Sequence, residues 1–350
     1  MPAGKKKNLL SPTQLRKKEH LELCLDAGGA PYPSGGVFDR YAFVHNALPE
    51  IDMAEIDPST TFLGKSLRAP LLISSMTGGF ELAREVNKNL AIAAQELGLA
   101  MGVGSQRVAL EQPGTAATFQ VREVAPDILL LANLGAVQLN YGYGIEHCRR
   151  AVGMIKADGL ILHLNVLQEA VQPEGNRNFK GLGQRIAAVC RDLEVPVVAK
   201  EVGSGISAEV AVRLKKAGVK AIDVAGVGGT SWYAVEAKRA AKEGQPQDSA
   251  FAAWGIPTDE ALISVRQAVP DLELVASGGI RSGLDVAKAI CMGATLCGIG
   301  QPLLKPALES AQQVVRFLQT IIHGLRVAML CVGAADLASL RKAALMRRSP

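Results

Sequence analysis

Eight apolar segments recur along residues 70–299, each followed by a polar or glycine-rich turn and then by a helix-forming stretch. The segments are unbroken runs of Val, Ile, Leu and Ala, which is typical of parallel strands buried on both faces. Strands are predicted at 70–76, 99–103, 128–132, 160–166, 195–199, 221–225, 273–276 and 295–299. The second strand is expected to lead through a turn into a helix up to Val124, and the sixth into a long loop before a helix at 259–268. Because a polar signature follows every strand, all eight signatures fall on one rim of a closed barrel. The sequence therefore predicts an α/β fold, a (β/α)8 TIM barrel. A doubly wound open sheet is the alternative, but it would not need polar groups at all eight strand ends.

The barrel is predicted to lie within a single domain at residues 16–350. A flexible basic tail at 1–15 precedes it, a segment at 16–69 leads into the first strand, and C-terminal helices are expected at 305–350. Ten of the 38 Lys and Arg residues lie within 1–18 and 341–350, which contain no acids, so the net charge of +5 belongs to the two ends. The body has no basic face with stacking aromatics, which argues against nucleic acid as a partner.

Cysteine usage and apolar patterning indicate the compartment. The six cysteines form no C-x-x-C pair, which favours reduced, buried thiols over disulfides or zinc. The first residues lack the apolar stretch of a signal peptide, and the apolar segment 327–335 is too short to span a bilayer. We expect a soluble, cytoplasmic protein with no membrane partner.

Residues 163–179 follow the fourth predicted strand and hold the densest polar cluster. His163 and Asn165 share one face of the strand, and Gln168 and Glu169 fall just beyond its end, before a Pro/Gly/Asn-rich loop. A single carboxylate among oxygen donors suits Mg²⁺, which keeps waters and bridges to substrate phosphates. The competing interpretations are an ion pair of Glu169 with Arg107 or Lys17, and a core role for His163.

Glycine-rich turns at 277–283 and 298–300 follow the seventh and eighth strands, the usual phosphate site of such barrels. Lys200 ends the fifth strand, where a buried cation requires an anionic partner or a reaction, and a structural ion pair is the alternative. Thr77, Asn133 and Thr230 each end a strand and offer neutral hydrogen bonds to a flat heteroaromatic ring. Together these features predict a flavin across the barrel mouth, with its phosphate on the last two strands.

A basic cluster lies near the N-terminus. Arg16, Lys17 and His20 fall within about one helical turn, and Arg16 and His20 share a face. The cluster is either a solvated basic turn or a clamp for an anion.

The ordered motifs R-K-x-x-H, M-T-G-G, G-S-Q-R, N-L-G, H-L-N-x-x-Q-E, K-E-V-G-x-G, G-G-T-S-W and G-G-I-R run from Arg16 to about Leu304. Together they resemble the type 2 isopentenyl diphosphate isomerases, flavin-dependent (β/α)8 enzymes. The resemblance implies isomerisation of isopentenyl to dimethylallyl diphosphate, with reduced FMN as acid and base and no net redox change. It also implies reduction of FMN by NADPH, and a homotetramer or homo-octamer.

The same resemblance implies roles for individual residues. FMN would be held by Met76, Thr77, Gly78, Ser105, Asn133, Lys200, Thr230, Gly279, Arg281, Gly300 and Gln301. The substrate would be held by Arg16, Lys17, His20, Ser105, Gln106, Arg107 and Gln168. The catalytic group would be Gln168, His163 and Asn165, and the Mg²⁺ ligand Glu169.

Two other functions remain open from the residues. One is an FMN oxidoreductase of the 2-hydroxy-acid oxidase type, which needs a histidine base with an arginine near it late in the barrel. Of the five histidines only His323, in the final helices, follows the sixth strand. The other is a non-catalytic flavin- or phosphate-binding protein, for which we would expect the loss of Arg16, Gln168 or Glu169.

Overall fold

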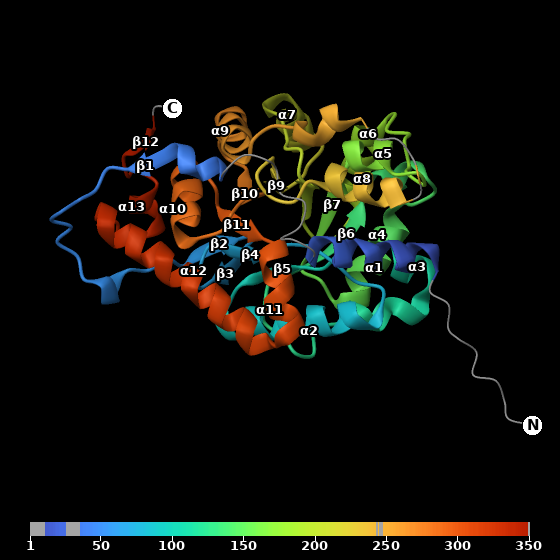
Figure 1. Ribbon diagram of the computed structural model, residues 1–350, viewed down its shortest axis with the longest axis horizontal. Helices are drawn as coiled ribbons and strands as arrows, with labels where there is room; N and C mark the ends of the chain where they lie inside the picture. Colours follow the sequence, from blue (N-terminus) through green and yellow to red (C-terminus); the bar gives the residue numbers. More distant parts are fainter. Residues whose placement is uncertain (1–10, 26–35, 243, 245–247, 349–350) are drawn as a thin grey trace, which may run out of the picture.

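The computed structural model describes residues 11–25, 36–242, 244 and 248–348 (Figure 1). Eight parallel strands close into a barrel, in which each strand pairs with its neighbours in the chain and the last pairs with the first. The strands are β4 (Leu71–Ile73), β5 (Ala100–Gly102), β6 (Leu130–Gly135), β7 (Gly159–Leu164), β8 (Val197–Glu201), β9 (Ala221–Asp223), β10 (Glu273–Ser277) and β11 (Leu296–Ile299). The predicted (β/α)8 barrel is therefore confirmed.

Outer helices cover the barrel between successive strands. They are α2 (Glu81–Leu97), α3 (Arg107–Glu111), α4 (Ile145–Ile155), α6 (Leu182–Asp192), α7 (Ala208–Lys216), α9 (Thr258–Ala268) and α10 (Gly283–Cys291). In α2 the buried residues Ala83, Val86, Leu90 and Ala94 form one stripe at helical spacing, which packs on the barrel. The stretch 107–124 is not one helix as predicted, because Pro113 ends α3 and starts the 3-10 turn η4 (Pro113–Thr118).

An antiparallel hairpin closes the barrel at the N-terminal ends of its strands. Strands β2 (Thr60–Phe62) and β3 (Lys65–Leu67) pair through a tight turn. Phe62 is fully buried, and together with Leu67 it joins the interior cluster that contains Leu131 and Val275. This end is therefore packed with apolar side chains, and only the C-terminal ends of the strands are open to a ligand.

Two further helices lie on the rim where the sequence predicted no helix. Helix α5 (Val166–Val171) follows β7 directly, and α8 (Trp232–Lys242) follows β9. Residues 166–171 contain no turn former before Pro173, so the strand passes into a helix, and Gln168 and Glu169 belong to α5. Asn165 is consequently the cap residue of α5, since β7 ends at Leu164.

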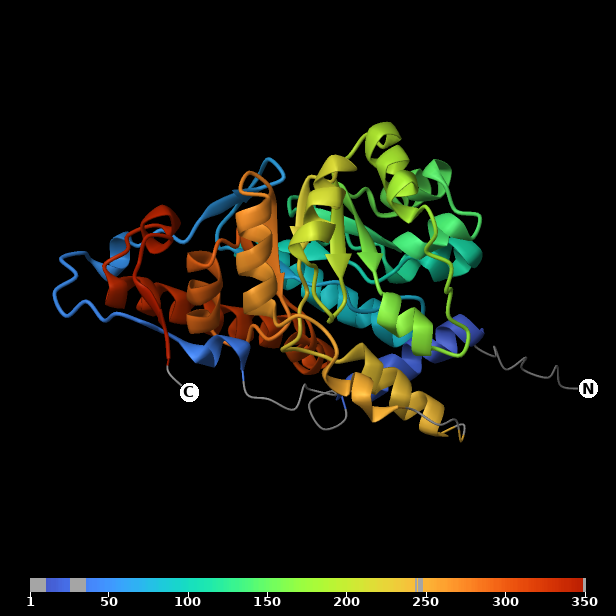
Figure 2. The same cartoon turned by 90° about the horizontal axis from the view of Figure 1, so that it is seen from above.

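Helix α1 (Pro12–Leu25) lies on the side to which the barrel strands point, next to α8 (Figure 2). It begins within the segment 1–15 that was predicted to be flexible. Ser11 and Gln14 form a reciprocal cap: the Ser11 N–H donates to Gln14 Oε1 at 2.9 Å, and the Gln14 N–H donates to Ser11 Oγ at 3.3 Å. Pro12 fits the first helical position. Residues 1–10 of the predicted tail lie outside the described part of the chain.

The segment predicted as C-terminal helices contains α11 (Leu304–Glu309), α12 (Ala311–Val332) and α13 (Leu337–Leu340), but it ends in strand β12 (Leu345–Arg347). Strand β12 pairs antiparallel with β1 (Tyr41–Phe43), so helix does not continue through this segment. Within the described residues α12 has the length and apolar composition of a membrane-spanning helix. Its buried side, which includes Leu318 and Leu325, packs against α2 and α10.

The remaining described elements are single turns of 3-10 helix: η2 (Val37–Arg40), η3 (Met53–Glu55), η5 (Ala136–Asn140), η6 (Ser249–Ala253) and η7 (Gln301–Leu303). Of these, η7 follows β11 and reaches back to α1, because Gln301 Nε2 donates to the Cys24 carbonyl at 3.1 Å. This contact fastens one end of α1 over the barrel mouth.

Candidate active site

A cavity of about 440 Å³ lies between the C-terminal ends of the strands and α1. Its lining draws on every strand end and on the N-terminal helix. Of the residues predicted from the sequence, those that line it are Arg16, Lys17, His20, Met76, Thr77, Ser105, Arg107, Asn133, His163, Asn165, Gln168, Glu169, Lys200, Thr230, Gly279, Arg281, Gly300 and Gln301. Residues that are far apart in the sequence, from α1 to the turn after β11, therefore line the same cavity.

Gln106 and Gly78 are not part of this lining. Gln106 is fully buried beneath the rim, where Nε2 donates to the Ala151 carbonyl at 2.8 Å and Oε1 accepts from the Asn133 N–H at 3.0 Å. Both polar ends of its side chain are thus used to hold backbone, and the substrate role predicted for Gln106 does not fit this placement. Gly78 packs against Phe119, at which an added Cβ would lie 2.0 Å from a ring carbon. Gly78 therefore leaves the space that the Phe119 ring occupies.

Lys200 stands on the cavity floor with a carboxylate behind it. Its Nζ lies 3.1 Å from Asp223 Oδ2 and donates to the Glu201 carbonyl at 2.8 Å. An ion pair and a cofactor role were alternatives for Lys200 on sequence grounds, but the structure gives it both the partner and a place in the lining. Asp223 was not among the predicted residues.

The turns after β9 and β10 approach each other closely along the cavity wall. An added Cβ at Gly279 would lie 2.8 Å from the Gly228 carbonyl oxygen, and Gly279 has a φ of 93°. Only glycine combines this backbone conformation with this contact. Arg281 follows the turn and pairs with Asp39 at 2.8 Å. An anion bound at the start of α10 would therefore lie close to the backbone of these turns and to the Arg281 guanidinium.

The donor set of this part of the cavity fits a flavin mononucleotide. The buried hydroxyls of Ser74 and Ser75, at the end of β4, line the cavity and have no hydrogen-bond partner among the described residues. Unpaired buried hydroxyls are costly unless a ligand satisfies them. With Lys200 on the floor and Arg281 beside the glycine turns, a flat polar ring with a phosphate tail would find complementary groups along the cavity.

His163 is held as a neutral ring. Burial, reinforced by the nearby positive charges of Lys200 and Lys17, lowers the pKa of His163 from 6.5 to about 3. Its Nδ1 lies 2.8 Å from Asn133 Oδ1, so Nδ1 carries the proton that this amide oxygen accepts. A proton at Nδ1 leaves Nε2 of the neutral ring as an acceptor.

Glu169 and Asn165 form a pair of oxygen donors. Asn165 Nδ2 donates to Glu169 Oε1 at 3.1 Å, and Glu169 Oε2 accepts from the Asn176 N–H at 2.5 Å. Asn165 Oδ1 is buried and has no partner within the part of the chain that the structure describes. The ion pairs considered as alternatives for Glu169 are not formed, because Arg107 pairs with Glu111 instead, at 2.7 Å, and the Lys17 ammonium bonds the Ser105 carbonyl.

A carboxylate and an unpaired amide oxygen match the chemistry of Mg²⁺, provided that substrate oxygens and water complete its shell. Among the described residues no group of three His, Cys, Asp or Glu side chains could bind a metal by itself. A metal at Glu169 would therefore depend on oxygens that the ligand brings.

The face of α1 that looks into the cavity is basic. The Lys17 Nζ donates to the Ser105 carbonyl at 2.6 Å, and burial, followed by repulsion from Arg16, lowers the pKa of Lys17 to about 7. The Arg16 side chain is 16% exposed and lies 3.4 Å from Glu174. Arg16 and Lys17 are therefore two partly buried cations with weak counter-ions, which suits them to binding an anionic ligand. The interpretation of this cluster as a solvated basic turn is wrong.

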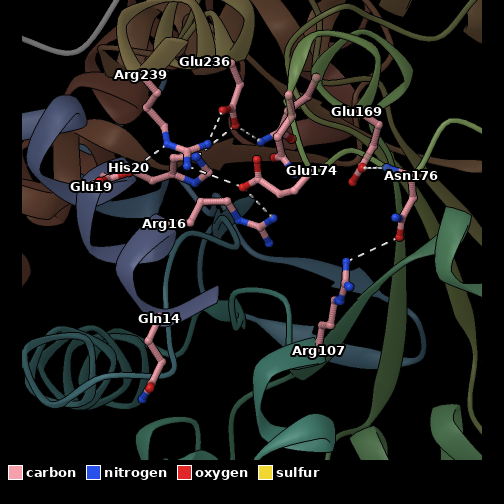
Figure 3. A network of polar contacts seen from close by, with 12 residues as sticks. Gln14, Arg16, Glu19, His20, Arg107, Glu169, Glu174, Asn176, Glu236 and Arg239 are labelled. Carbon is pink, nitrogen blue, oxygen red and sulfur yellow. Dashed lines mark hydrogen bonds and ion pairs between the residues drawn. The ribbon is translucent and has the colours of Figure 1, made fainter. Parts of the chain in front are cut away.

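A network not predicted from the sequence joins α1 to α8 (Figure 3). Glu236 Oε1 lies 2.9 Å from His20 Nε2 and accepts from Gln168 Nε2 at 3.0 Å, and Glu236 Oε2 lies 2.6 Å from Arg239. Arg239 also pairs with Glu19 at 2.9 Å. Helix α8 was predicted as a loop, although Ala-rich residues 232–242 carried a helical signal.

Charge in this network lies on Glu236 and Arg239. Burial would raise the pKa of Glu236, but hydrogen bonds from His20, Gln168 and Arg239 outweigh it and lower that pKa to about 2. Burial lowers the pKa of His20, and its bond to Glu236 offsets this only in part. Glu236 is thus a buried anion that orients the amide of Gln168 and anchors α1.

Comparison with known proteins identifies the family. A family profile described as "FMN-dependent dehydrogenase" matches residues 168–347. A protein of Stutzerimonas stutzeri named isopentenyl-diphosphate delta-isomerase is 55% identical over 336 residues, which cover 95% of this chain and 97% of the relative. Proteins of the same name from Nostoc sp. and Pseudescherichia vulneris are 50% and 51% identical, over 96% and 94% of this chain and 96% and 95% of the relatives.

Solved structures of similar fold are more distant in sequence. A mandelate oxidase superposes with a TM-score of 0.66 at 18% identity, covering 95% of this chain and 99% of the oxidase. A putative lactate oxidase of Pediococcus acidilactici superposes with a TM-score of 0.65 at 17% identity, covering 99% of this chain and 97% of the oxidase. At this identity the likeness concerns the fold alone. The curated relatives together with the matched profile show that the chain belongs to the FMN-dependent, type 2 isopentenyl-diphosphate delta-isomerases.

Proposed function

We propose that the protein isomerises isopentenyl diphosphate to dimethylallyl diphosphate, with reduced FMN and without net redox change. The observation that carries this proposal is the arrangement of one cavity, in which Lys200 forms the floor, glycine turns form a wall, and Arg16 and Lys17 face them from α1. A diphosphate at these cations would place a short alkene over a ring on the floor. Fixing the reacting carbons in this way is itself a large part of catalysis.

FMN as the cofactor is supported by the matched profile and by the donor set of the floor. When bound and reduced, FMN supplies a proton at N5 and an electron-rich ring that stabilises a cation on the substrate. The described part of the chain places no side chain as a strong acid for an unactivated alkene: His163 is neutral, and Glu236 is a buried anion. The side chains therefore bind, orient and exclude water around the reacting carbons.

The roles of the polar residues follow from their partners. Arg16, Lys17 and Arg107 bind the diphosphate by charge, and neutral His163 and Ser105 complete its hydrogen bonds. Gln168 is held by Asn165 at 3.1 Å and by Glu236 at 3.0 Å, so its amide has a fixed orientation. In the proposed complex this amide would lie beside the allylic carbons. Glu169, with Asn165 Oδ1, would hold a Mg²⁺, which would neutralise part of the diphosphate charge.

The resemblance of the motifs also supports finer proposals. NADPH would reduce the FMN, and the protein would assemble as a homotetramer or homo-octamer in the cytoplasm. Residues 16–350 would act as one FMN-binding domain, with the segment 16–69 as its substrate clamp.

A 2-hydroxy-acid oxidase activity is disfavoured by the cavity. Such an oxidase needs a histidine base late in the barrel, whereas the two histidines in this lining are His20 from α1 and His163 from β7. The two cations of α1 also match the charge of a diphosphate better than the single carboxylate of a small hydroxy acid.

The test is turnover by the holoenzyme. Protein loaded with FMN and Mg²⁺ and reduced with dithionite under anaerobic conditions is incubated with isopentenyl diphosphate, and proton NMR follows the vinyl and allylic signals. We expect equilibration with dimethylallyl diphosphate only after reduction of the flavin. Absence of dimethylallyl diphosphate from fully reduced, Mg²⁺-loaded enzyme would overturn the proposal.

A further inference from the structure

Asp223 and Lys200 form a buried ion pair across neighbouring strands. They are register partners on β9 and β8, so their side chains leave the sheet side by side. The Lys200 Nζ lies 3.1 Å from Asp223 Oδ2, and the two side chains are 10% and 1% exposed. Lys200 lines the cavity, whereas Asp223 lies behind it and does not. The carboxylate can therefore reach a ligand only through the ammonium.

The two oxygens of Asp223 have separate partners. Oδ1 accepts from Ser277 Oγ at 2.6 Å and from the Ala225 N–H at 3.2 Å. Within the described part of the chain, the contact of Oδ2 is its ion pair with Lys200, and no further donor reaches it. Oδ1 thus ties the carboxylate to the barrel and to Ala225, which has a φ of 37°, while Oδ2 serves the ammonium.

Other titratable groups near this pair cannot replace the carboxylate. Glu201, next to Lys200, turns its Oε2 to the backbone N–H groups of 202–204, and burial raises the pKa of Glu201 to about 7. His163 from β7 is neutral, and burial raises the pKa of the Cys297 thiol from β11. Among the described residues, Asp223 is the carboxylate in contact with the Lys200 ammonium.

We propose that Asp223 is a positioning residue for the flavin site, which acts on the bound cofactor by fixing the Lys200 ammonium on the cavity floor and balancing its charge. The ammonium donates to the Glu201 carbonyl and to Ser277 Oγ, at 3.4 Å, and pairs by charge with Asp223, so these contacts fix its position at the edge of the cavity. This inference rests on the proposed function only in taking FMN as the occupant of the floor.

Asp223→Asn is the sharpest variant, because it can keep the oxygen that serves Ser277 and Ala225. It replaces the other oxygen by an NH₂ group, which opposes the ammonium donor to donor. The buried cation is then left without a counter-ion, a loss that costs far more than deletion of both partners. Lys200→Met removes the ammonium, and the double variant removes both charges.

The experiment is a double-mutant cycle on the affinity for FMN. Apoprotein of the wild type, D223N, K200M and D223N/K200M is titrated with FMN by fluorescence quenching, the absorption spectrum of bound flavin is recorded, and urea midpoints are measured in parallel. Asp158→Asn is the matched control, since Asp158 pairs with Arg122 at 2.9 Å just before β7, at the opposite end of the barrel.

We expect D223N to raise the Kd for FMN by about tenfold or more in the wild-type background, but by less than about twofold in the K200M background. D223N should alter the flavin spectrum only where Lys200 is present, and D158N should shift the urea midpoint without changing the Kd. Equal losses of affinity in both backgrounds would show a merely structural role and overturn the proposal.

The experiment also decides the proposal if one of the variants does not fold. If D223N does not fold but D223N/K200M does, the uncompensated charge is the cause and the proposal stands; if both fail while K200M folds, it is wrong. An enzyme that binds FMN in the wild type but gives no dimethylallyl diphosphate would refute the proposed function and leave this cycle interpretable.

Discussion

His20 Nε2 and Glu236 Oε1 lie 2.9 Å apart, and this contact joins the N-terminal helix to a helix that follows the sixth barrel strand. The same carboxylate holds Gln168, so the closure of α1 over the cavity and the orientation of this amide depend on one buried anion. Binding of the α1 cations to a substrate would therefore be coupled to the position of Gln168.

Glu236→Gln should loosen α1. The change leaves Arg239 without its buried counter-ion and removes the charge that faces His20, so we expect tryptic cleavage within α1 to accelerate by at least about tenfold. The rate of cleavage is followed by mass spectrometry. Glu22→Gln, on the exposed side of α1 where Glu22 lies 3.8 Å from Lys18, is the control and should leave the rate unchanged. Equal cleavage rates for E236Q and wild type would contradict this anchoring role.

Lys17 should impose a pH limit on substrate capture. Its pKa of about 7 in the free protein means that the ammonium is lost as the pH rises through that value. Because kcat/KM reports ionisations of the free enzyme, it should fall above about pH 7 on account of Lys17. Lys17→Arg keeps its charge and should move this alkaline limb to higher pH. A limb of unchanged position in K17R would assign the ionisation to another group.

Glu169→Gln should abolish the Mg²⁺ dependence of turnover while FMN stays bound. The amide keeps the shape of the side chain but carries no charge for the metal. Activity is measured against Mg²⁺ concentration, and flavin content by absorbance. Glu174→Gln, a change of a nearby carboxylate that is 45% exposed, is the matched control and should retain the Mg²⁺ response. Loss of FMN from E169Q would remove Glu169 from the metal role.

His163 should make the apoprotein sensitive to acid. Folding lowers its pKa from the ordinary value of 6.5 to about 3, so the unfolded chain binds the proton more strongly between these values. Its contribution to stability is present above pH 6.5 and is lost as the pH falls toward 3, by up to about 1.4 kcal/mol per pH unit. Urea unfolding at several pH values should show a weaker acid dependence for His163→Gln. Parallel stability–pH curves for the two proteins would exclude this contribution.

Gln106→Leu should damage stability more than substrate binding. It leaves the buried Asn133 N–H without its acceptor, at a cost of about 1–3 kcal/mol, and it also removes the bond to the Ala151 carbonyl. Urea unfolding measures the loss, and KM for the diphosphate should change by less than about twofold. An increase in KM at unchanged stability would restore the substrate role that the motif suggested for Gln106.

The barrel and the strand-end residues were predictable because each depends on local order. A buried strand followed by a polar turn places its last residues and that turn on the rim wherever the strand lies in the chain, and this brought Lys200, Asn133 and Thr230 into one lining. Because the barrel is closed, these strand ends necessarily surround the same cavity.

The features of the site that could not be predicted from the sequence depend on contacts between residues that are distant in the chain. Gln106 belongs to the G-S-Q-R motif, for which a substrate role was expected, but both ends of its side chain bind backbone groups. Asp223 lies in an apolar strand, and only the register with β8 places it against Lys200. Glu236 was missed because α8 was predicted as a loop, although its alanines and the absence of breakers indicated a helix.

The pairing of β1 with β12 has a consequence for biosynthesis. Tyr41 is the register partner of Arg347, so β1, within the clamp segment 16–69, cannot pair until β12 has been synthesised some three hundred residues later. Contacts this distant in sequence form late in folding. A chain truncated before β12 would contain the barrel strands but would leave β1 without its partner strand.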